Sequence, residues 1–179
     1  MPPSRFLRKG YKARKYKENE EFKGMIKILF VCHGNICRSP MAEFLFKDYV
    51  KRQGMEKEFL IKSAATSSEE IGNPVHHGTV RVLKKIGIST EGKYAIKLRK
   101  EDYTAHDYFI GMDDANIRNM IRIFGGDPEG KIYKLLDFTD RGGSIADPWY
   151  SGDFEATYRD VIEGIDGLYI HIMSREGGK

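Results

Sequence analysis

The feature that most restricts the fold of this chain is the alternation of short apolar segments with longer amphipathic ones. The first apolar segment, residues 25–31, reads MIKILFV and is typical of a buried strand. Further strands are predicted at residues 59–64, 108–112 and 131–135. Between these segments, apolar residues recur every three or four positions, as in helices that cover a sheet. Strands that alternate with helices form parallel sheets through right-handed crossovers.

We therefore predict an α/β fold with three layers, α/β/α, around a central four-stranded parallel sheet. Helices are expected from Ser39 as N-cap, near Val75, from Asp113 and near Asp153. In the third of these helices, the predicted buried face consists of Ile117, Met120, Ile121 and Phe124. Since ligands bind at the carboxyl ends of parallel strands, the loop after the first strand is the expected site.

Composition excludes several classes of protein. The chain has 179 residues, of which 40% are hydrophobic and 31% charged, as in one globular domain. Its longest unbroken apolar run, Ile28–Cys32, is far shorter than the ~20 residues of a membrane helix. No secretory signal is recognisable, and two cysteines cannot form a disulfide framework. We predict no membrane span and a cytoplasmic location.

Positive charge is concentrated at the N-terminus. Residues 1–27 hold nine Lys or Arg and three Glu, a net charge of +6, while the rest of the chain is close to neutral. We predict that residues 1–22 form a basic flexible extension and that residues 23–179 form a single domain. A solvated tail is favoured over an element that binds RNA or a membrane or that directs the chain to an organelle.

The loop after the first strand reads CHGNICRS and places Cys32 six residues before Arg38. The intervening residues can curl so that their N–H groups point inward, and the next helix adds partial positive charge. Arg38 can hold two oxygens of an oxyanion, and we expect Cys32 to be a thiolate there. The pattern favours nucleophilic attack on phosphorus over a packing cysteine. The predicted phosphate-binding loop consists of His33, Gly34, Asn35, Ile36, Cys37 and Arg38.

The sequence resembles the low-molecular-weight protein tyrosine phosphatases over about residues 27–173. The resemblance rests on five segments that follow one another in order. They are VCHGNICRSPMAE at 31–43, SAATS at 63–67, IGNP at 71–74, DYFIGMD at 107–113 and DPWY at 147–150.

This resemblance implies hydrolysis of phosphotyrosine and aryl phosphates without metal or cofactor. Cys32 would form a phosphocysteine while Asp147 protonates the leaving oxygen and later activates water. Arg38 and the loop amides would hold the phosphate oxygens, and Ser39 would hydrogen-bond the thiolate. The substrate would be a tyrosine-phosphorylated protein, with phosphate and other oxyanions as competitive ligands.

Supporting roles are implied as well. Asn35 is expected in a left-handed conformation, bound to Ser63. Asp113 and Glu43 would orient Arg38, and Asp113 is also a suitable N-cap, so that both roles can hold at once.

The resemblance also predicts a deep slot that suits a flat aromatic ring. Trp149 and Tyr150 would form one wall, with His33, Ile36 and Glu70 opposite. A weak homodimer that pairs through this aromatic rim is compatible with the sequence. No metal site is predicted, and the adjacent His76 and His77 are expected to be surface residues.

Two positions depart from the family pattern. Lys93 and Ile96 stand where the family often has His and Arg, so we expect a different hydrogen-bond network behind Asn35 and an altered pH optimum.

Cys37 has two interpretations. It is either a packing cysteine or the partner of Cys32 in a reversible disulfide.

Three other functions share sequence features with this chain. An arginine phosphatase of the same fold tends to have Thr where this chain has Ile36. An arsenate reductase needs further cysteines, and none follows Cys37. The third is an inactive phosphate-binding module whose basic tail contacts nucleic acid. Against it, the nucleophile, the arginine and the acid of an active enzyme are all present.

Overall fold

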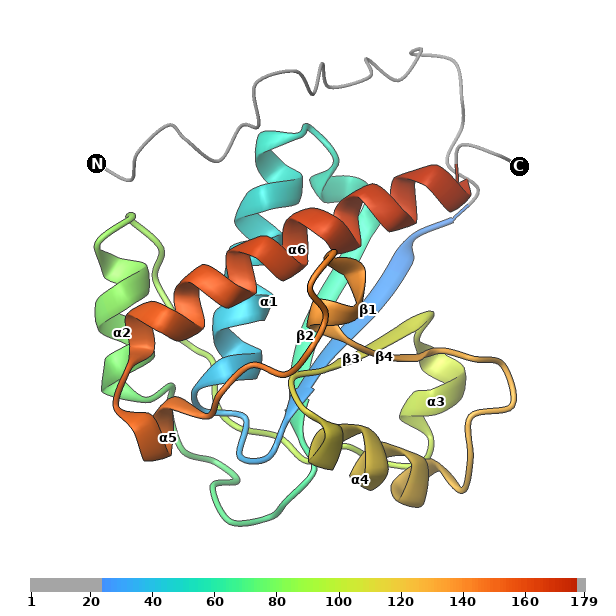
Figure 1. Cartoon of the computed structure of the whole chain (residues 1–179), viewed down its shortest axis with the longest axis horizontal. Coiled ribbons are helices and arrows are strands. Elements are labelled where there is room, and N and C mark those ends of the chain that lie inside the picture. The colour runs from blue at the N-terminus through green and yellow to red at the C-terminus, as the bar shows by residue number, and fades with distance from the viewer. Residues whose placement is uncertain (1–23, 177–179) are drawn as a thin grey trace.

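The computed structural model describes residues 24–176, and the predicted N-terminal extension lies outside them. The chain alternates strands and helices in the predicted order (Figure 1). The elements are β1 (Ile26–Cys32), α1 (Arg38–Arg52), the 3-10 turn η2 (Glu56–Glu58), β2 (Phe59–Ala65), α2 (His77–Lys84), α3 (Asp102–Ala105), β3 (Tyr108–Gly111), α4 (Asp114–Phe124), β4 (Ile132–Lys134), the 3-10 turn η3 (Leu135–Phe138), α5 (Pro148–Ser151) and α6 (Phe154–Glu176).

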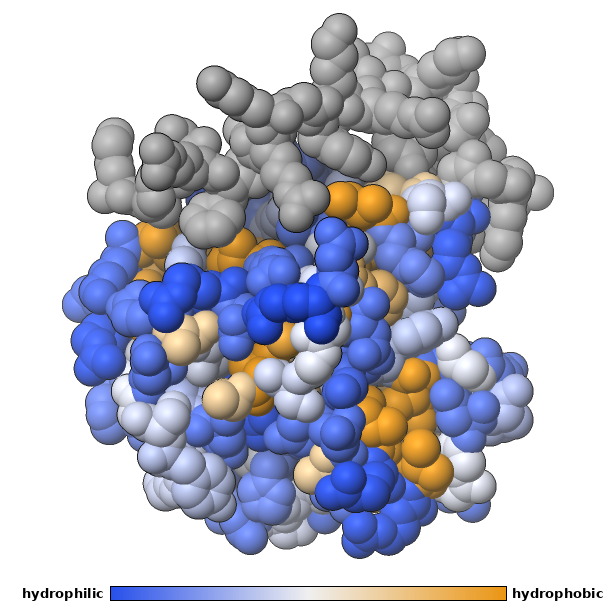
Figure 2. Space-filling view, in the orientation of Figure 1, coloured by the Kyte–Doolittle hydropathy of each residue, from blue (hydrophilic) through white to orange (hydrophobic). Residues whose placement is uncertain are grey.

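The four strands form one parallel sheet in the order β2-β1-β3-β4. The long helix α6 runs beside α1 on one side of the sheet (Figure 1). Their apolar side chains join those of α2 in one core cluster, while α4 and Tyr103 of α3 contribute to a second cluster on the opposite face. The predicted three-layer α/β/α architecture is therefore confirmed. Hydrophilic residues cover most of the coloured surface in Figure 2.

The alternation of side chains along β1 explains its unbroken apolar run. Ile28 and Phe30 belong to the cluster beneath α1 and α6, whereas Leu29 and Val31 belong to the cluster beneath α4. An inner strand of a sheet covered on both faces needs apolar residues at every position. By the same alternation, Cys32 at the end of β1 lies on the α1 side.

Helix α4 begins as predicted, but its buried face is narrower. Asp113 caps it, and Asp113 and Asn116 form a reciprocal capping box. Met120 and Phe124 are buried, while Ile121 is 42% exposed, so the prediction of a buried Ile121 was wrong. One residue advances the helix by about 100°, which carries Ile121 away from the stripe that Met120 forms.

Close packing of α6 depends on glycine. A Cβ atom at Gly167 would overlap the main-chain carbonyl of Phe138 in η3.

Within residues 24–176, no helix is long and apolar enough to cross a lipid bilayer.

Candidate active site

The loop of residues 33–37 connects the end of β1 to the start of α1. Helix α1 begins at Arg38, and its N-cap, Cys37, makes no side-chain hydrogen bond to the first turn. The prediction that Ser39 caps this helix was wrong, because its hydroxyl contacts Cys32 instead. The uncapped first-turn N–H groups of α1 are thus able to bind an anion.

Cys32 lies at the bottom of this loop with two polar neighbours. Its Sγ atom is 3.0 Å from Ser39 Oγ and receives the main-chain N–H of Asn35 at 3.3 Å. Both neighbours can donate to sulfur, and hydrogen bonds to the charged form of a group favour that form. The surroundings of Cys32 are therefore suited to a thiolate.

The side chain of Asn35 stabilises the conformation of the loop through hydrogen bonds. Its φ of 57° makes it the one non-glycine residue with positive φ in the described chain. Its Oδ1 accepts the main-chain N–H of Ile96 at 3.1 Å, which fixes the orientation of the amide. Its Nδ2 then donates to Ser39 Oγ at 2.8 Å and to Ser63 Oγ at 2.9 Å. The predicted bond between Asn35 and Ser63 is confirmed.

These hydrogen bonds have a defined direction. Ser63 donates its hydroxyl proton to Glu43 Oε1 at 2.7 Å, since a carboxylate can only accept. The oxygens of Ser63 and Ser39 both accept from Asn35, so the proton of Ser39 remains available for Cys32. The chain of bonds thus makes Ser39 a donor to the sulfur.

Contrary to prediction, Glu43 forms neither a hydrogen bond nor an ion pair with Arg38. Besides Ser63, its carboxylate binds Lys47 at 2.9 Å and Lys93 at 3.5 Å. Lys93 also donates to the carbonyl of Ser63 at 2.9 Å. Burial lowers the pKa of Lys93, and Glu43 opposes this shift. Lys93, one of the two departures from the family pattern, therefore places its ammonium group beside Ser63 and Glu43, which support the loop.

Arg38 is 2% exposed and lies among acceptors. Its Nη1 donates to Asp113 at 2.6 Å and to the carbonyl of Ile145 at 3.0 Å, and its Nη2 donates to Asp147 at 3.3 Å. Burial alone would lower the pKa of Arg38, but Cys32, Asp113 and Asp147 outweigh burial and raise it. Asp113 caps α4 while it binds Arg38, so both expected roles hold together.

Asp147 is oriented by the short helix α5 that follows it. Its Oδ1 accepts the main-chain N–H of Trp149 at 3.0 Å, which leaves Oδ2 facing Arg38. A quarter of its side chain is exposed, and it lines a pocket together with residues of the loop. Its carboxylate is thus placed to exchange a proton with a group bound there.

The pocket has a volume of about 110 Å³. The five residues predicted to form its walls all line it, and Trp149 and Tyr150 on α5 are exposed. Sequence reasoning missed one lining residue, Glu69, which pairs with His33 at 3.0 Å, because no motif indicates it. The lining residues are Cys32, His33, Gly34, Ile36, Cys37, Arg38, Glu69, Glu70, Asp147, Trp149 and Tyr150.

His76 supports the aromatic wall and is half-buried, whereas the neighbouring His77 is exposed, as predicted for a surface residue. Its ring meets Trp149 edge-on at 5.6 Å and stacks on Phe154 at 5.0 Å. Its Nδ1 accepts the N–H of Gly78 at 3.0 Å, which caps α2. This bond requires Nδ1 to be unprotonated.

Cys37 differs from Cys32 in its surroundings. It is 5% exposed, and burial, with Cys32 as the next cause, raises its pKa to about 12. Neither Cys32 nor Cys37 is in a disulfide. Cys37 is therefore protonated near neutral pH.

Comparison with known proteins agrees with this geometry. A family model described as low molecular weight phosphotyrosine protein phosphatase matches residues 27–176. The chain is 37% identical over 154 residues to the low molecular weight protein-tyrosine-phosphatase YfkJ of Bacillus subtilis, covering 85% of this chain and 99% of YfkJ. It is 34% identical to PtpA of Staphylococcus aureus, covering 83% of this chain and 95% of PtpA.

Solved structures give the same result. The crystal structure of YfkJ matches with a TM-score of 0.81 over 85% of this chain and 97% of that chain. The low molecular weight protein tyrosine phosphatase SP-PTP from Streptococcus pyogenes matches with a TM-score of 0.73 and 39% identity, over 84% of this chain and 93% of SP-PTP. The chain is therefore an enzyme of the low molecular weight phosphotyrosine protein phosphatase family.

Proposed function

We propose that this enzyme hydrolyses phosphotyrosine in proteins, and aryl phosphates, through a phosphocysteine on Cys32. One observation carries the proposal: the sulfur of Cys32, the guanidinium of Arg38 and the carboxylate of Asp147 line one small pocket. Nucleophile, anion clamp and proton donor are the groups that metal-free phosphoryl transfer requires.

In the first step, the thiolate of Cys32 attacks phosphorus. The S–P bond forms as the bond from phosphorus to the phenolic oxygen breaks, and Asp147 gives its proton to that oxygen. In the second step, water attacks phosphorus, Asp147 takes a proton from the water, and the S–P bond breaks. Inorganic phosphate leaves, and the thiolate is regenerated.

Arg38 would change partners as the phosphate binds. Its Nη1 donates to Asp113 and to the carbonyl of Ile145, whereas its Nη2 donates, among residues 24–176, to Asp147 alone, at 3.3 Å. Phosphate oxygens, with their greater charge, would replace Asp147 on Nη2. Asp147 would then be free to act on the leaving oxygen while Asp113 keeps the guanidinium in place.

The walls of the pocket support an aromatic substrate. Trp149 and Tyr150 present ring surface on one side, and Ile36 adds an apolar contact. A phosphotyrosine ring can stack between such walls. The relatives named above are protein tyrosine phosphatases, which supports the same substrate class.

The free cysteines support two further parts of the proposal. Unbridged thiols agree with a reducing, cytoplasmic location.

Under peroxide, oxidation of Cys32 to a sulfenic acid would remove the charge that helps to raise the pKa of Cys37. The thiol of Cys37 would then displace water from Cys32 and close a disulfide, which a thiol reductant reopens.

Turnover of para-nitrophenyl phosphate in the presence of EDTA tests the proposal. The reduced wild type is expected to be active, Cys32→Ser inactive, and Asp147→Ala slower by ~10²–10⁴. Inorganic phosphate should inhibit competitively. Parallel assays with a phosphotyrosine peptide and a phosphoarginine peptide separate the aryl phosphatase from the arginine phosphatase. A folded, reduced wild type that is inert on all three substrates would leave only a phosphate-binding module.

A further inference from the structure

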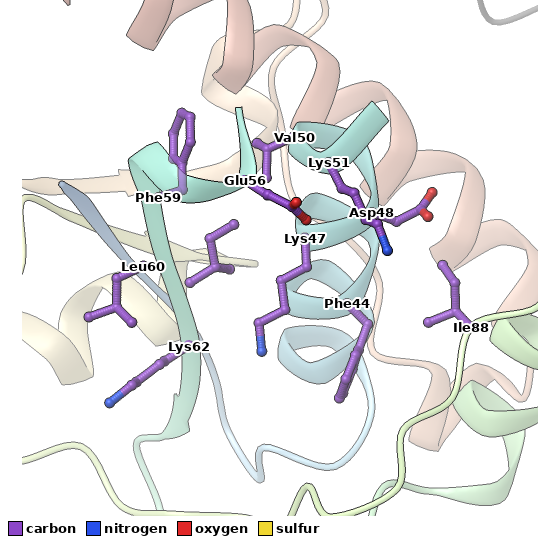
Figure 3. A pocket seen from close by; sticks show the side chains of 11 residues that line it. Phe44, Lys47, Asp48, Val50, Lys51, Glu56, Phe59, Leu60, Lys62 and Ile88 are labelled. Carbon is purple, nitrogen blue, oxygen red and sulfur yellow. The ribbon is translucent and has the colours of Figure 1, made fainter. Parts of the chain in front are cut away.

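A second cavity, about 530 Å³ in volume, lies apart from the active site between α1 and β2 (Figure 3). Leu60 and Lys62 lie on one side of β2, and the side chains of α1 lie on the other. Since residues from both faces of β2 line this groove, the groove runs along the outer edge of the strand. None of its lining residues lines the catalytic pocket. They are Phe44, Lys47, Asp48, Val50, Lys51, Glu56, Phe59, Leu60, Ile61, Lys62 and Ile88.

The carboxyl end of this outer edge is covered by another part of the chain. In the sheet, β2 is an edge strand next to β1. Thr66 donates its N–H to the carbonyl of Cys32 at 3.0 Å, on the side of β1. Ala65 faces the other way, since it donates to Ile96 at 2.7 Å and accepts from Leu98 at 2.8 Å. The segment that contains Ile96 and Leu98 therefore occupies the outer edge of β2 at this end.

Further toward its amino end, the outer edge of β2 is open. Successive residues of a strand direct their main-chain groups to opposite sides, so Phe59, Ile61 and Ser63 face outward as Ala65 does. The carbonyl of Ser63 accepts from Lys93 at 2.9 Å. Within residues 24–176, no hydrogen bond satisfies the outward N–H and C=O groups of Phe59 and Ile61. Unpaired edge groups form a template for another strand.

A second copy of this chain can satisfy these open groups. Two copies related by a two-fold axis would bring their β2 strands together in antiparallel orientation. With Phe59 of one copy opposite Ile61 of the other, the two residues of each pair exchange both of their main-chain hydrogen bonds. Every open group of the edge is then used. The axis passes beside Leu60, which lies opposite Leu60 of the other copy.

Neighbouring registers use the edge less completely. A shift in one direction would place Phe59 opposite Ser63, whose carbonyl is already bound by Lys93. A shift in the other direction would place Ile61 opposite Lys57, which lies in the turn η2 rather than in the strand. The register that pairs Phe59 with Ile61 is therefore the one that the open groups favour.

The same register brings opposite charges together. Lys62 of each copy comes opposite Glu58 of the other, in pairs without main-chain hydrogen bonds, where side chains lie closest. Neither residue forms an ion pair within residues 24–176. A lysine on an edge strand ordinarily opposes the pairing of edges, but here its charge meets a carboxylate. On the α1 side, the groove residues without an ion pair in that range are Lys51 and Glu56, whose charges are opposite in sign.

We propose that the outer edge of β2 binds a second copy of this chain, so that the sheets of the two copies join through an antiparallel pair of β2 strands. Main-chain hydrogen bonds between Phe59 and Ile61 hold the strands together, Lys62–Glu58 ion pairs fix the register, and the two Leu60 side chains pack at the axis. The catalytic loops follow the carboxyl ends of the two β1 strands, which point in opposite directions in such a pair. Both catalytic pockets therefore stay open, and the inference does not depend on the proposed reaction.

Analytical ultracentrifugation of the full chain, between about 1 μM and about 1 mM, measures the self-association. A reversible dimer is expected within this range. Amide hydrogen exchange, read residue by residue by mass spectrometry, locates the contact. Exchange at Phe59 and Ile61 should be roughly tenfold slower at concentrations where the dimer dominates than at those where the monomer does. The amides of Leu60 and Lys62 face β1 and should not respond to concentration.

Exchange of charge between Glu58 and Lys62 tests the register. Glu58→Lys and Lys62→Glu each place like charges opposite one another and should weaken the dimer roughly tenfold or more. The double variant Glu58→Lys/Lys62→Glu restores opposite charges and should recover the association of the wild type. Glu101→Lys and Arg118→Glu make the same changes of charge at exposed positions elsewhere and should not affect association. All of these variants should keep wild-type turnover of para-nitrophenyl phosphate.

Several results would overturn the proposal. A chain that stays monomeric up to about 1 mM removes the interface. Slow exchange at Phe59 and Ile61 that does not depend on concentration would show that the chain itself covers the edge. A double variant as weakly associated as either single variant would contradict the proposed register. A dimer that these variants leave intact and that Trp149→Ala/Tyr150→Ala dissociates would place the interface at the aromatic rim of the catalytic pocket instead.

Discussion

The hydroxyl oxygen of Ser39 lies 3.0 Å from the sulfur of Cys32 and accepts a hydrogen bond from Asn35. Because Asn35 occupies the acceptor side of this hydroxyl, the proton of Ser39 is directed at the sulfur. The same bond would stabilise the thiolate that leaves when a phosphocysteine is hydrolysed. Ser39 would therefore act mainly on the second step of the reaction.

Ser39→Ala is expected to slow breakdown of the phosphoenzyme more than its formation. Loss of a hydrogen bond to a charged group costs about 1.5–3 kcal/mol, which corresponds to roughly 10- to 100-fold in rate. Stopped-flow measurement of para-nitrophenol release should show a burst followed by slow turnover. Ser174→Ala, at the exposed end of α6, is the control. Equal slowing of burst and turnover would contradict this role for Ser39.

The pH dependence of stability should include a contribution from His76. Burial, and next His77, lowers the pKa of His76 from its ordinary value of 6.5. As the pH falls through that value, the unfolded chain takes up a proton that the folded chain resists, so the free energy of unfolding decreases. Stability is therefore lost on the acid side and is retained above the ordinary value.

His76→Asn should reduce this acid sensitivity, because Asn can accept from Gly78 without titrating. Urea unfolding at about pH 7.5 and at about pH 5.5 measures the change. The variant is expected to lose less stability between the two conditions than the wild type, whatever its absolute stability. His77→Asn removes only the second cause of the lowered pKa, so its pH dependence should lie between those of the wild type and His76→Asn. An unchanged dependence in His76→Asn would show that this histidine does not contribute.

Gly167→Ala should destabilise the fold, because the added methyl group would overlap the carbonyl of Phe138. Overpacking of this kind costs about 1–3 kcal/mol, and more where main chain must move. The midpoint of urea unfolding measures the effect. Arg159→Ala, on the exposed side of the same helix, should change stability by no more than about 0.5 kcal/mol. Wild-type stability in Gly167→Ala would mean that α6 is not packed as described.

Local sequence patterns were sufficient to predict the strands and the layers of this fold. β1 was recognisable because a strand buried on both faces is apolar at every position. Errors arose where the type of a residue suits one role but its neighbours in the fold give it another. Ser39 is a good N-cap by type, but a nearby sulfur uses its hydroxyl. Ile121 fits the helical period, yet it lies at the edge of the stripe that packs on the sheet.

Partners across the fold could not be predicted from the residues alone. Glu43 is separated from Ser63 by 20 positions, and Arg38 from the carbonyl of Ile145 by 107. Nothing in the residue types indicates these pairs, since a carboxylate or a carbonyl accepts from any nearby donor. The resemblance supplied Asp113 and Asn35 correctly but assigned Glu43 to Arg38. Lys93 was recognised as a departure, whereas its contact with Glu43 emerged only from the structure.

Detection of the covalent intermediate tests the central claim most directly. Asp147→Ala should still form the phosphoenzyme from para-nitrophenyl phosphate, whose leaving group needs little protonation, and should hydrolyse it slowly. After rapid acid quench, mass spectrometry is expected to find one added HPO₃ group on the tryptic peptide of residues 28–38. The group should persist in a Cys37→Ser background and vanish in Cys32→Ser. Release of para-nitrophenol without an adduct, or with an adduct on any other residue, would contradict the phosphocysteine mechanism.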